Sequence, residues 1–95
     1  MFDRTLKLIK DKVLSRQYVM TIHADEEKDA DGLTILDIEN CILTGRIIER
    51  QKDRLTGEWK YKISGESKSG KPVELITKIS PTGKLVIITV YLIKR

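Results

Sequence analysis

The chain has 95 residues, which is enough for one small domain spanning residues 1–95, with a core of one sheet and two or three helices. Its hydrophobic fraction of 40% and charged fraction of 34% exclude a disordered chain, and no apolar run is long enough to span a bilayer. The net charge of +4 is unevenly distributed, since residues 1–22 carry +3, residues 23–45 carry −6 and residues 46–95 carry +7.

The start of the chain has scattered charges and lacks the apolar core of a secretory signal. A single cysteine, Cys41, excludes an intrachain disulfide, so we expect a cytoplasmic protein with no membrane partner. One histidine and one cysteine do not supply the ligands of a zinc site. We therefore expect neither a metal nor a cofactor.

The first half of the chain predicts three helices and one strand. Apolar residues at helical spacing, Phe2, Leu6, Ile9 and Val13, predict a helix over residues 3–14. The β-branched and aromatic segment 17–22 predicts a strand.

The acidic block of residues 23–45 predicts the next two helices. Residues 23–32 favour a short, mostly exposed helix that Gly32 ends. Thr34 is a good N-cap for a second helix that ends at Gly45, and Asp37 suits its first turn. We expect the acidic surface of these helices to face away from the basic sheet.

The second half predicts four strands, at residues 46–52, 58–66, 72–80 and 84–93, separated by turn-forming segments. The segment LVIITVYLI is apolar on both faces, which indicates a strand inside the sheet. The predicted fold is α+β, in the order α-β-α-α-β-β-β-β, with the helices on one face of a mainly antiparallel sheet of four to five strands.

The segment IHADEEKDADGLTILDIENCILTG resembles the His-Ala…(Asp/Arg)-Gly-(Leu/Ile)-Thr…Asp-(Ile/Val)-Glu…Gly signature of a family of small domains of unknown function. That family is usually grouped with the RelE/ParE, BrnT and MqsR-like toxins. The resemblance runs from about Tyr18 to the end of the chain and includes GRIIER, GEWKYKISG and LVIITVY.

This resemblance implies a RelE-like fold and the toxin role of a toxin–antitoxin pair. It implies a metal-independent endoribonuclease of the mRNA-interferase kind, acting on RNA that is free or on the ribosome. The implied partner is a cognate antitoxin with a zinc-finger segment and a helix-turn-helix. Two other interpretations stay open: a non-catalytic module that binds RNA or protein, and a toxin with a protein target.

His23 is the sharpest candidate for catalysis, because RNA cleavage without a metal needs a base and an acid with pKa values near neutrality. Its position between a strand and a helix also suits a structural role, in which the imidazole caps the helix or bonds a backbone carbonyl. The sequence leaves both roles open.

Cationic side chains of the predicted strands form the second candidate set. Lys60 and Lys62 are two residues apart and share a face, which Lys78 joins from the next strand. Arg46 and Arg50 are four residues apart, which is also an even number, so we expect them to share a face of their strand. We assign Lys60 and Tyr91 to catalysis with His23, and Arg46, Arg50, Lys62 and Lys78 to RNA binding, with the solvent-facing half of an ordinary sheet as the alternative.

Trp59 and Tyr61 could stack on bases, but their alternation with charged residues favours core positions. Cys41 lies among apolar residues and is expected to be a small core residue.

Overall fold

The structure is a computed structural model that describes residues 2–93 of the chain. Its elements follow the predicted order and are α1 (Asp3–Leu14), β1 (Tyr18–Met20), α2 (Ile22–Ala30), α3 (Ile35–Thr44), β2 (Arg46–Lys52), β3 (Trp59–Glu66), β4 (Pro72–Ile79) and β5 (Leu85–Leu92). The α+β class is therefore confirmed.

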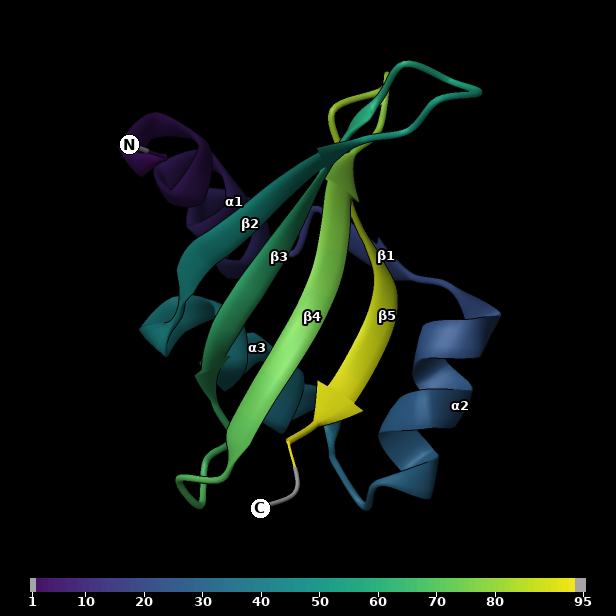
Figure 1. Ribbon diagram of the computed structural model, residues 1–95. Helices are drawn as coiled ribbons and strands as arrows, with labels where there is room; N and C mark the ends of the chain where they lie inside the picture. Colours follow the sequence, from purple (N-terminus) through teal and green to yellow (C-terminus); the bar gives the residue numbers. More distant parts are fainter. Residues whose placement is uncertain (1, 94–95) are drawn as a thin grey trace.

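The five strands form one sheet in the order β1-β5-β4-β3-β2 (Figure 1). Strands β2 to β5 are contiguous and antiparallel, whereas β1 pairs with β5 in parallel. The predicted inner position of residues 84–93 is confirmed, because β5 lies between β4 and β1.

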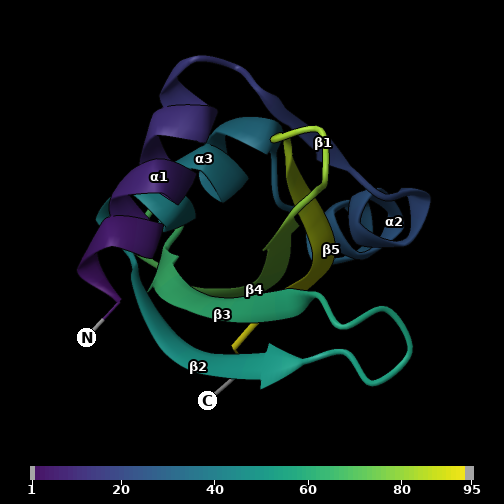
Figure 2. The same cartoon turned by 90° about the horizontal axis from the view of Figure 1, so that it is seen from above.

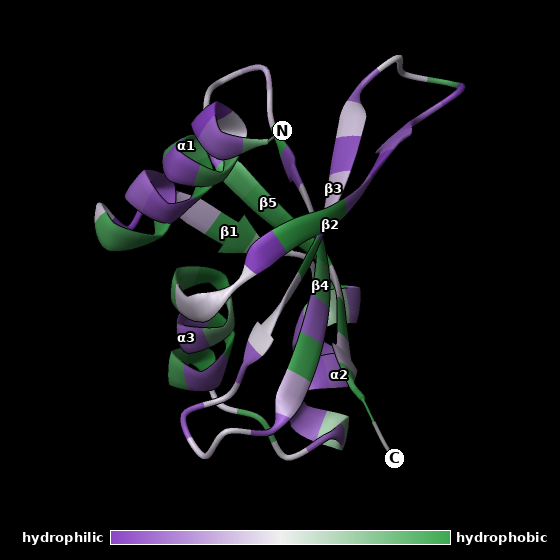
Figure 3. Ribbon diagram, turned by 60° about the vertical axis from the view of Figure 1, so that its left-hand side comes forward, coloured by the Kyte–Doolittle hydropathy of each residue, from purple (hydrophilic) through white to green (hydrophobic). Residues whose placement is uncertain are grey.

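Helices α1 and α3 lie on one side of the curved sheet, and α2 lies beside β5 (Figure 2). The core forms between the sheet and the helices α1 and α3. Figure 3 shows the apolar segments of β5 and β1 next to α1. The large, fully buried aliphatic side chains come from both layers: Ile9, Ile38, Ile42, Ile63, Val73, Leu75, Leu85, Ile87 and Val90.

Helix α3 is fixed at its start by a reciprocal capping box between Thr34 and Asp37. The Asp37 carboxylate also accepts a hydrogen bond from the backbone N–H of Lys68, at 3.0 Å, in the turn between β3 and β4. Hydrogen bonds from the Thr34 and Lys68 backbones lower the pKa of Asp37. One carboxylate thus joins the helix to the sheet.

The backbone of the same helix lies against the backbone of β3 near Gly65. A Cβ atom added to Gly65 would lie 2.0 Å from the carbonyl oxygen of Cys41, and one added to Gly45 would lie 2.4 Å from the same oxygen. Only glycine fits at these two positions without moving the helix.

Helix α2 completes the outer edge of β5. The three residues of β1 pair only with Leu85–Ile87, so within residues 2–93 the rest of this edge has no strand beside it. There the carboxylate of Glu27 accepts a hydrogen bond from the Val90 N–H, and that of Asp31 accepts one from the Leu92 N–H, each at 3.1 Å.

The spacing of the two elements makes this match possible. Four residues of helix rise about 6 Å, and two residues of strand rise about 6.8 Å, so residues four apart on α2 meet residues two apart on β5. The expectation that the acidic block faces away from the sheet is therefore wrong for Glu27 and Asp31, which bind the sheet backbone.

Replacing both Glu27 and Asp31 with alanine should lower the free energy of unfolding by about 1–3 kcal/mol, because two strand N–H groups lose charged acceptors. Urea denaturation measures the loss, and amide hydrogen exchange should accelerate at Val90 and Leu92. Glu26→Ala is the matched control, since its side chain is exposed and should change stability little. Equal losses in the two proteins would contradict this role of α2.

Candidate functional site

The sheet face opposite α1 and α3 carries a row of polar side chains. Ile63 pairs with Leu75 on the buried side, so their neighbours Lys62 and Ile76, which also pair, point the other way. We call this surface the open face. It carries Glu49, Gln51, Lys60, Lys62, Glu74, Ile76, Lys78 and Tyr91.

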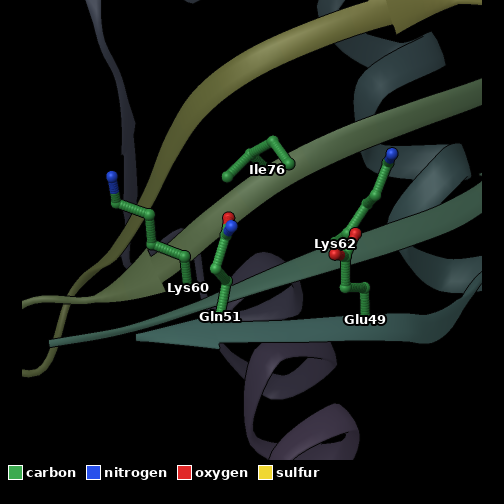
Figure 4. A pocket seen from close by; sticks show the side chains of 5 residues that line it. All are labelled: Glu49, Gln51, Lys60, Lys62 and Ile76. Atoms are coloured by element: carbon green, nitrogen blue, oxygen red, sulfur yellow. The ribbon is translucent and has the colours of Figure 1, made fainter. Parts of the chain in front are cut away.

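Figure 4 shows five of these side chains around a small depression that is lined by Glu49, Gln51, Lys60, Lys62 and Ile76. Its volume is about 10 Å³, which is the space of a single water molecule. The open face therefore offers a surface for an extended ligand and no deep pocket for a small one.

The predicted cluster of Lys60, Lys62 and Lys78 is present on the open face, and each lysine has a carboxylate partner. The three Nζ–O distances are 3.2 Å for Lys60 to Asp53, 3.3 Å for Lys62 to Glu74 and 3.2 Å for Lys78 to Glu58. The hydrogen bond that the Lys62 ammonium donates to the Glu74 carboxylate raises the pKa of Lys62. The positive charge of the three lysines is therefore largely balanced within the protein.

Lys62 is also the lysine that lies beside Tyr91. Its Nζ is 5.7 Å from the centroid of the Tyr91 ring, and Tyr91 pairs with Glu74 across β4 and β5. A cation, a carboxylate and a phenol thus gather at one point. Glu74 was absent from the predicted site, although its alternation with Ile76 and Lys78 along β4 places it on the same face.

Two members of the predicted catalytic set, Lys60 and Tyr91, lie in different rows of the sheet. Ser64 pairs with Glu74, which pairs with Tyr91, so these three residues form one row across the sheet. Lys60 lies four residues from Ser64 along β3, which is about 14 Å.

His23 lies in the first turn of α2, where its side chain is 70% exposed. Thr21, and not His23, is the N-cap of this helix, because its hydroxyl accepts a hydrogen bond from the Ala24 N–H at 3.0 Å. The His23 Nε2 lies 3.4 Å from Oε1 of Glu27, one turn further along α2.

A groove of about 330 Å³ lies between α2 and the end of β5. Its lining includes Glu27 and Asp31 from the helix and Tyr91 from the strand. Tyr91 therefore connects the open face with this groove, and His23 stands one helical turn before it.

The expectation that Arg46 and Arg50 share a face is wrong. Arg46 pairs with Ser64 on the open face, whereas Arg50 pairs with Tyr61 on the face of α1. A β-bulge between Ile47 and Glu49 inserts one residue and reverses the alternation.

Arg50 instead stacks on aromatic rings at the sheet edge. Its guanidinium carbon lies 4.1 Å from the Trp59 ring centroid and 5.7 Å from that of Phe2, while Lys52 Nζ lies 5.7 Å from the Trp59 centroid. Trp59 is 40% exposed, so the core position expected for it is wrong, whereas the half-buried Tyr61 packs against the core.

Within residues 2–93, no three His, Cys, Asp or Glu side chains are grouped so that they could hold a metal ion. Cys41 is fully buried, as expected, and its thiol donates to the Val73 carbonyl at 3.3 Å. Burial raises the pKa of this thiol to about 12. No helix in the described part of the chain is long and apolar enough to cross a membrane.

His23→Gln should change the free energy of unfolding by less than about 0.5 kcal/mol, because the His23 side chain is mostly exposed and, among the described residues, its one ionic contact is the helical pair with Glu27. Urea denaturation at pH 7 measures the difference. A loss well above that size would show that the imidazole has a structural role.

A family model described as "Domain of unknown function (DUF4258)" matches residues 20–92 of the chain. No curated protein and no solved structure matches it.

Proposed function

Because the chain belongs to the DUF4258 family, whose function is unknown, we propose a function from the molecule's own surface: it binds RNA on the open face and cleaves it without a metal. In this proposal the protein is the toxin of a toxin–antitoxin pair and acts as an endoribonuclease in the cytoplasm. Its motif resembles that of a family of small domains usually grouped with the RelE/ParE, BrnT and MqsR-like toxins, and that grouping supports the role. Its partners would be RNA, free or on the ribosome, and an antitoxin of the zinc-finger and helix-turn-helix kind.

The observation that carries the proposal is the open face itself. Helices α1 and α3 cover one side of the sheet, and the β3 and β4 part of the other side carries Lys60, Lys62 and Lys78 without a helix over it (Figure 2). Cations on a flat, extended strand surface suit the phosphates of a single-stranded RNA, and Tyr91 offers a ring for base stacking.

The ion pairs of the open face shape how RNA would bind. A phosphate that approaches Lys62 or Lys78 replaces the carboxylate of Glu74 or Glu58, so one anion is exchanged for another. Fewer solution counterions are released than three free lysines would release. The affinity should therefore be moderate, with a shallower dependence on salt than the lysine count suggests.

The cluster of Lys62, Glu74 and Tyr91 contains the groups that cleavage requires. Glu74 would take the proton of a ribose 2′-hydroxyl, and the 2′-oxygen would then attack the adjacent phosphorus. Tyr91 would donate its proton to the departing 5′-oxygen, which leaves a 2′,3′-cyclic phosphate and a 5′-hydroxyl. The Lys62 ammonium would stabilise the charge on the pentacovalent phosphorus.

The double variant Lys62→Glu and Lys78→Glu should weaken binding of a fluorescent 20-nucleotide RNA at least tenfold, because two cations of the open face become anions. Fluorescence anisotropy at two salt concentrations measures the affinity. Lys28→Glu with Lys68→Glu is the control with the same change of net charge, since Lys28 lies in α2 between Asp25 and Asp29, at 3.2 and 2.7 Å, and Lys68 lies in the exposed turn between β3 and β4. Similar losses in both proteins would mean that RNA responds only to total charge and would rule out the open face.

Tyr91→Phe should lower the rate of RNA cleavage by ~10²-fold or more, while RNA affinity and the melting temperature stay the same, because only the hydroxyl is lost. A cleavage time course with mapping of the cyclic phosphate end measures the rate. His23→Gln, measured beside it, tests whether the imidazole supplies the proton instead. If both variants cleave like the parent, the catalytic assignment is wrong.

A second candidate is a non-catalytic module that binds RNA or protein with the same surface. The separation of about 14 Å along the sheet between Lys60 and the row of Tyr91 favours this candidate, because these two predicted catalytic residues do not reach one phosphodiester together. Failure of the parent protein to cleave RNA with and without ribosomes, together with retained RNA binding, would select it.

A further inference from the structure

The outer edge of β2 has no strand beside it. This strand is the last in the sheet and pairs only with β3, within the part of the chain that the structure describes. An edge strand presents unpaired N–H and C=O groups and can bind another extended chain.

The hydrogen bonding of the β2–β3 hairpin shows which residues point outward. The Asp53 N–H donates to the Glu58 carbonyl at 2.8 Å, so the backbone of Asp53 points toward β3. Polar groups alternate along an antiparallel strand, and Lys52 and Arg50 are respectively one and three residues before Asp53. Their N–H and C=O groups therefore point to solvent.

The side chains of the same two residues place two positive charges next to each other on one face of the sheet. Both lie on the face of α1, because they pair with Trp59 and Tyr61. The guanidinium of Arg50 is held over the Trp59 ring, and neither cation forms an ion pair with a carboxylate of the described residues. This arrangement differs from the open face, where every lysine of the central cluster is paired.

Charge decides which chain can occupy this edge. A second copy that paired through its own Arg50 and Lys52 would place cations directly opposite cations, which is destabilising. An incoming strand with carboxylates at alternate positions would instead place an anion opposite each of them. The bulge at Ile47 and Glu49 ends the regular edge and limits the contact to a short segment.

We propose that the edge of β2 at Arg50–Lys52 binds an extended, acidic segment of a partner protein as a sixth strand of the sheet. In the complex, two carboxylates of the partner that are separated by one residue face Arg50 and Lys52. The Trp59 ring packs under the Arg50 guanidinium. Aromatic residues and arginine dominate binding energy at protein interfaces, and the stacked Arg50 is already ordered for such a contact. This inference does not depend on RNA binding, since it uses the other side of the sheet.

The probe is the acetylated and amidated peptide Thr-Val-Glu-Val-Glu-Val-Thr, titrated into ¹⁵N-labelled protein. We expect the amide signals of β2 and the indole signal of Trp59 to shift together. N-methylation of the two glutamates of the peptide should abolish the shifts, because their N–H groups face β2, whereas N-methylation of the central valine should preserve them.

The variant Arg50→Glu with Lys52→Glu should weaken peptide binding at least tenfold. Lys68→Glu with Lys71→Glu is the matched control, because it makes the same charge change in the exposed turn between β3 and β4 and should bind like the parent.

Four results would overturn the proposal. They are the absence of shifts at β2, binding that persists after N-methylation of the glutamates, the same shifts with a uridine oligonucleotide, and shifts that depend on protein concentration without peptide. The third would identify a nucleic-acid site and the fourth a dimer. RNA affinity should be measured on the same variant of Arg50 and Lys52. This measurement distinguishes a failure of the peptide-binding proposal from a failure of the proposal that RNA binds to the open face.

Discussion

The inner strand β5 needs hydrogen-bond partners along both edges, and the arrangement of the molecule depends on how its outer edge is completed. The short β1 supplies only the first part, with Tyr18–Met20 against Leu85–Ile87. The carboxylates of α2 supply the rest, at Val90 and Leu92. A strand that is apolar on both faces thereby stays inside the structure although its strand neighbour is short. Glu27 of α2 and Asp31 at its C-cap meet this need, because each of these two carboxylates accepts a hydrogen bond that a strand would otherwise accept.

This arrangement separates the surface into parts with different electrostatic properties. With α2 placed at the edge, α1 and α3 suffice to cover one side of the sheet, and the β3 and β4 part of the other side stays accessible (Figure 2). The lysines of the open face are matched by carboxylates on neighbouring positions, whereas Arg50 and Lys52 at the opposite edge are matched by an aromatic ring. Net charge per segment is thus a poor guide to where positive potential is available. Whether a cation contributes positive potential depends on whether a carboxylate is paired with it.

The fold was predictable because local signals agreed with one another. The two-faced apolar pattern of Leu85–Leu92, the capping residue Thr34 and the turn segments all pointed to the same order of elements. The candidate site was predictable only in part, because it depends on register. Alternation placed Lys60 and Lys62 correctly, but the bulge before Glu49 moved Arg50 to the other face. The carboxylate partners of the lysines come from β4 and from the turn between β2 and β3, so no local pattern could reveal that the lysines are paired. Trp59 alternates like a core residue but stands at the first position of β3, where its side chain is 40% exposed.

The contact of α3 with β3 also limits how the interior can change. At Gly65 and Gly45 the helix and the sheet meet through main-chain atoms, so the distance between the two layers at this end is fixed by the backbone. When a large side chain is replaced by a smaller one, a flexible protein recovers part of the loss as its layers move together. Here the layers near Cys41 are already in contact and have no room to approach. Shortened side chains beside them, such as those of Ile38 or Ile42, would leave an open void, so this end of the core should tolerate less sequence variation than the end near α1.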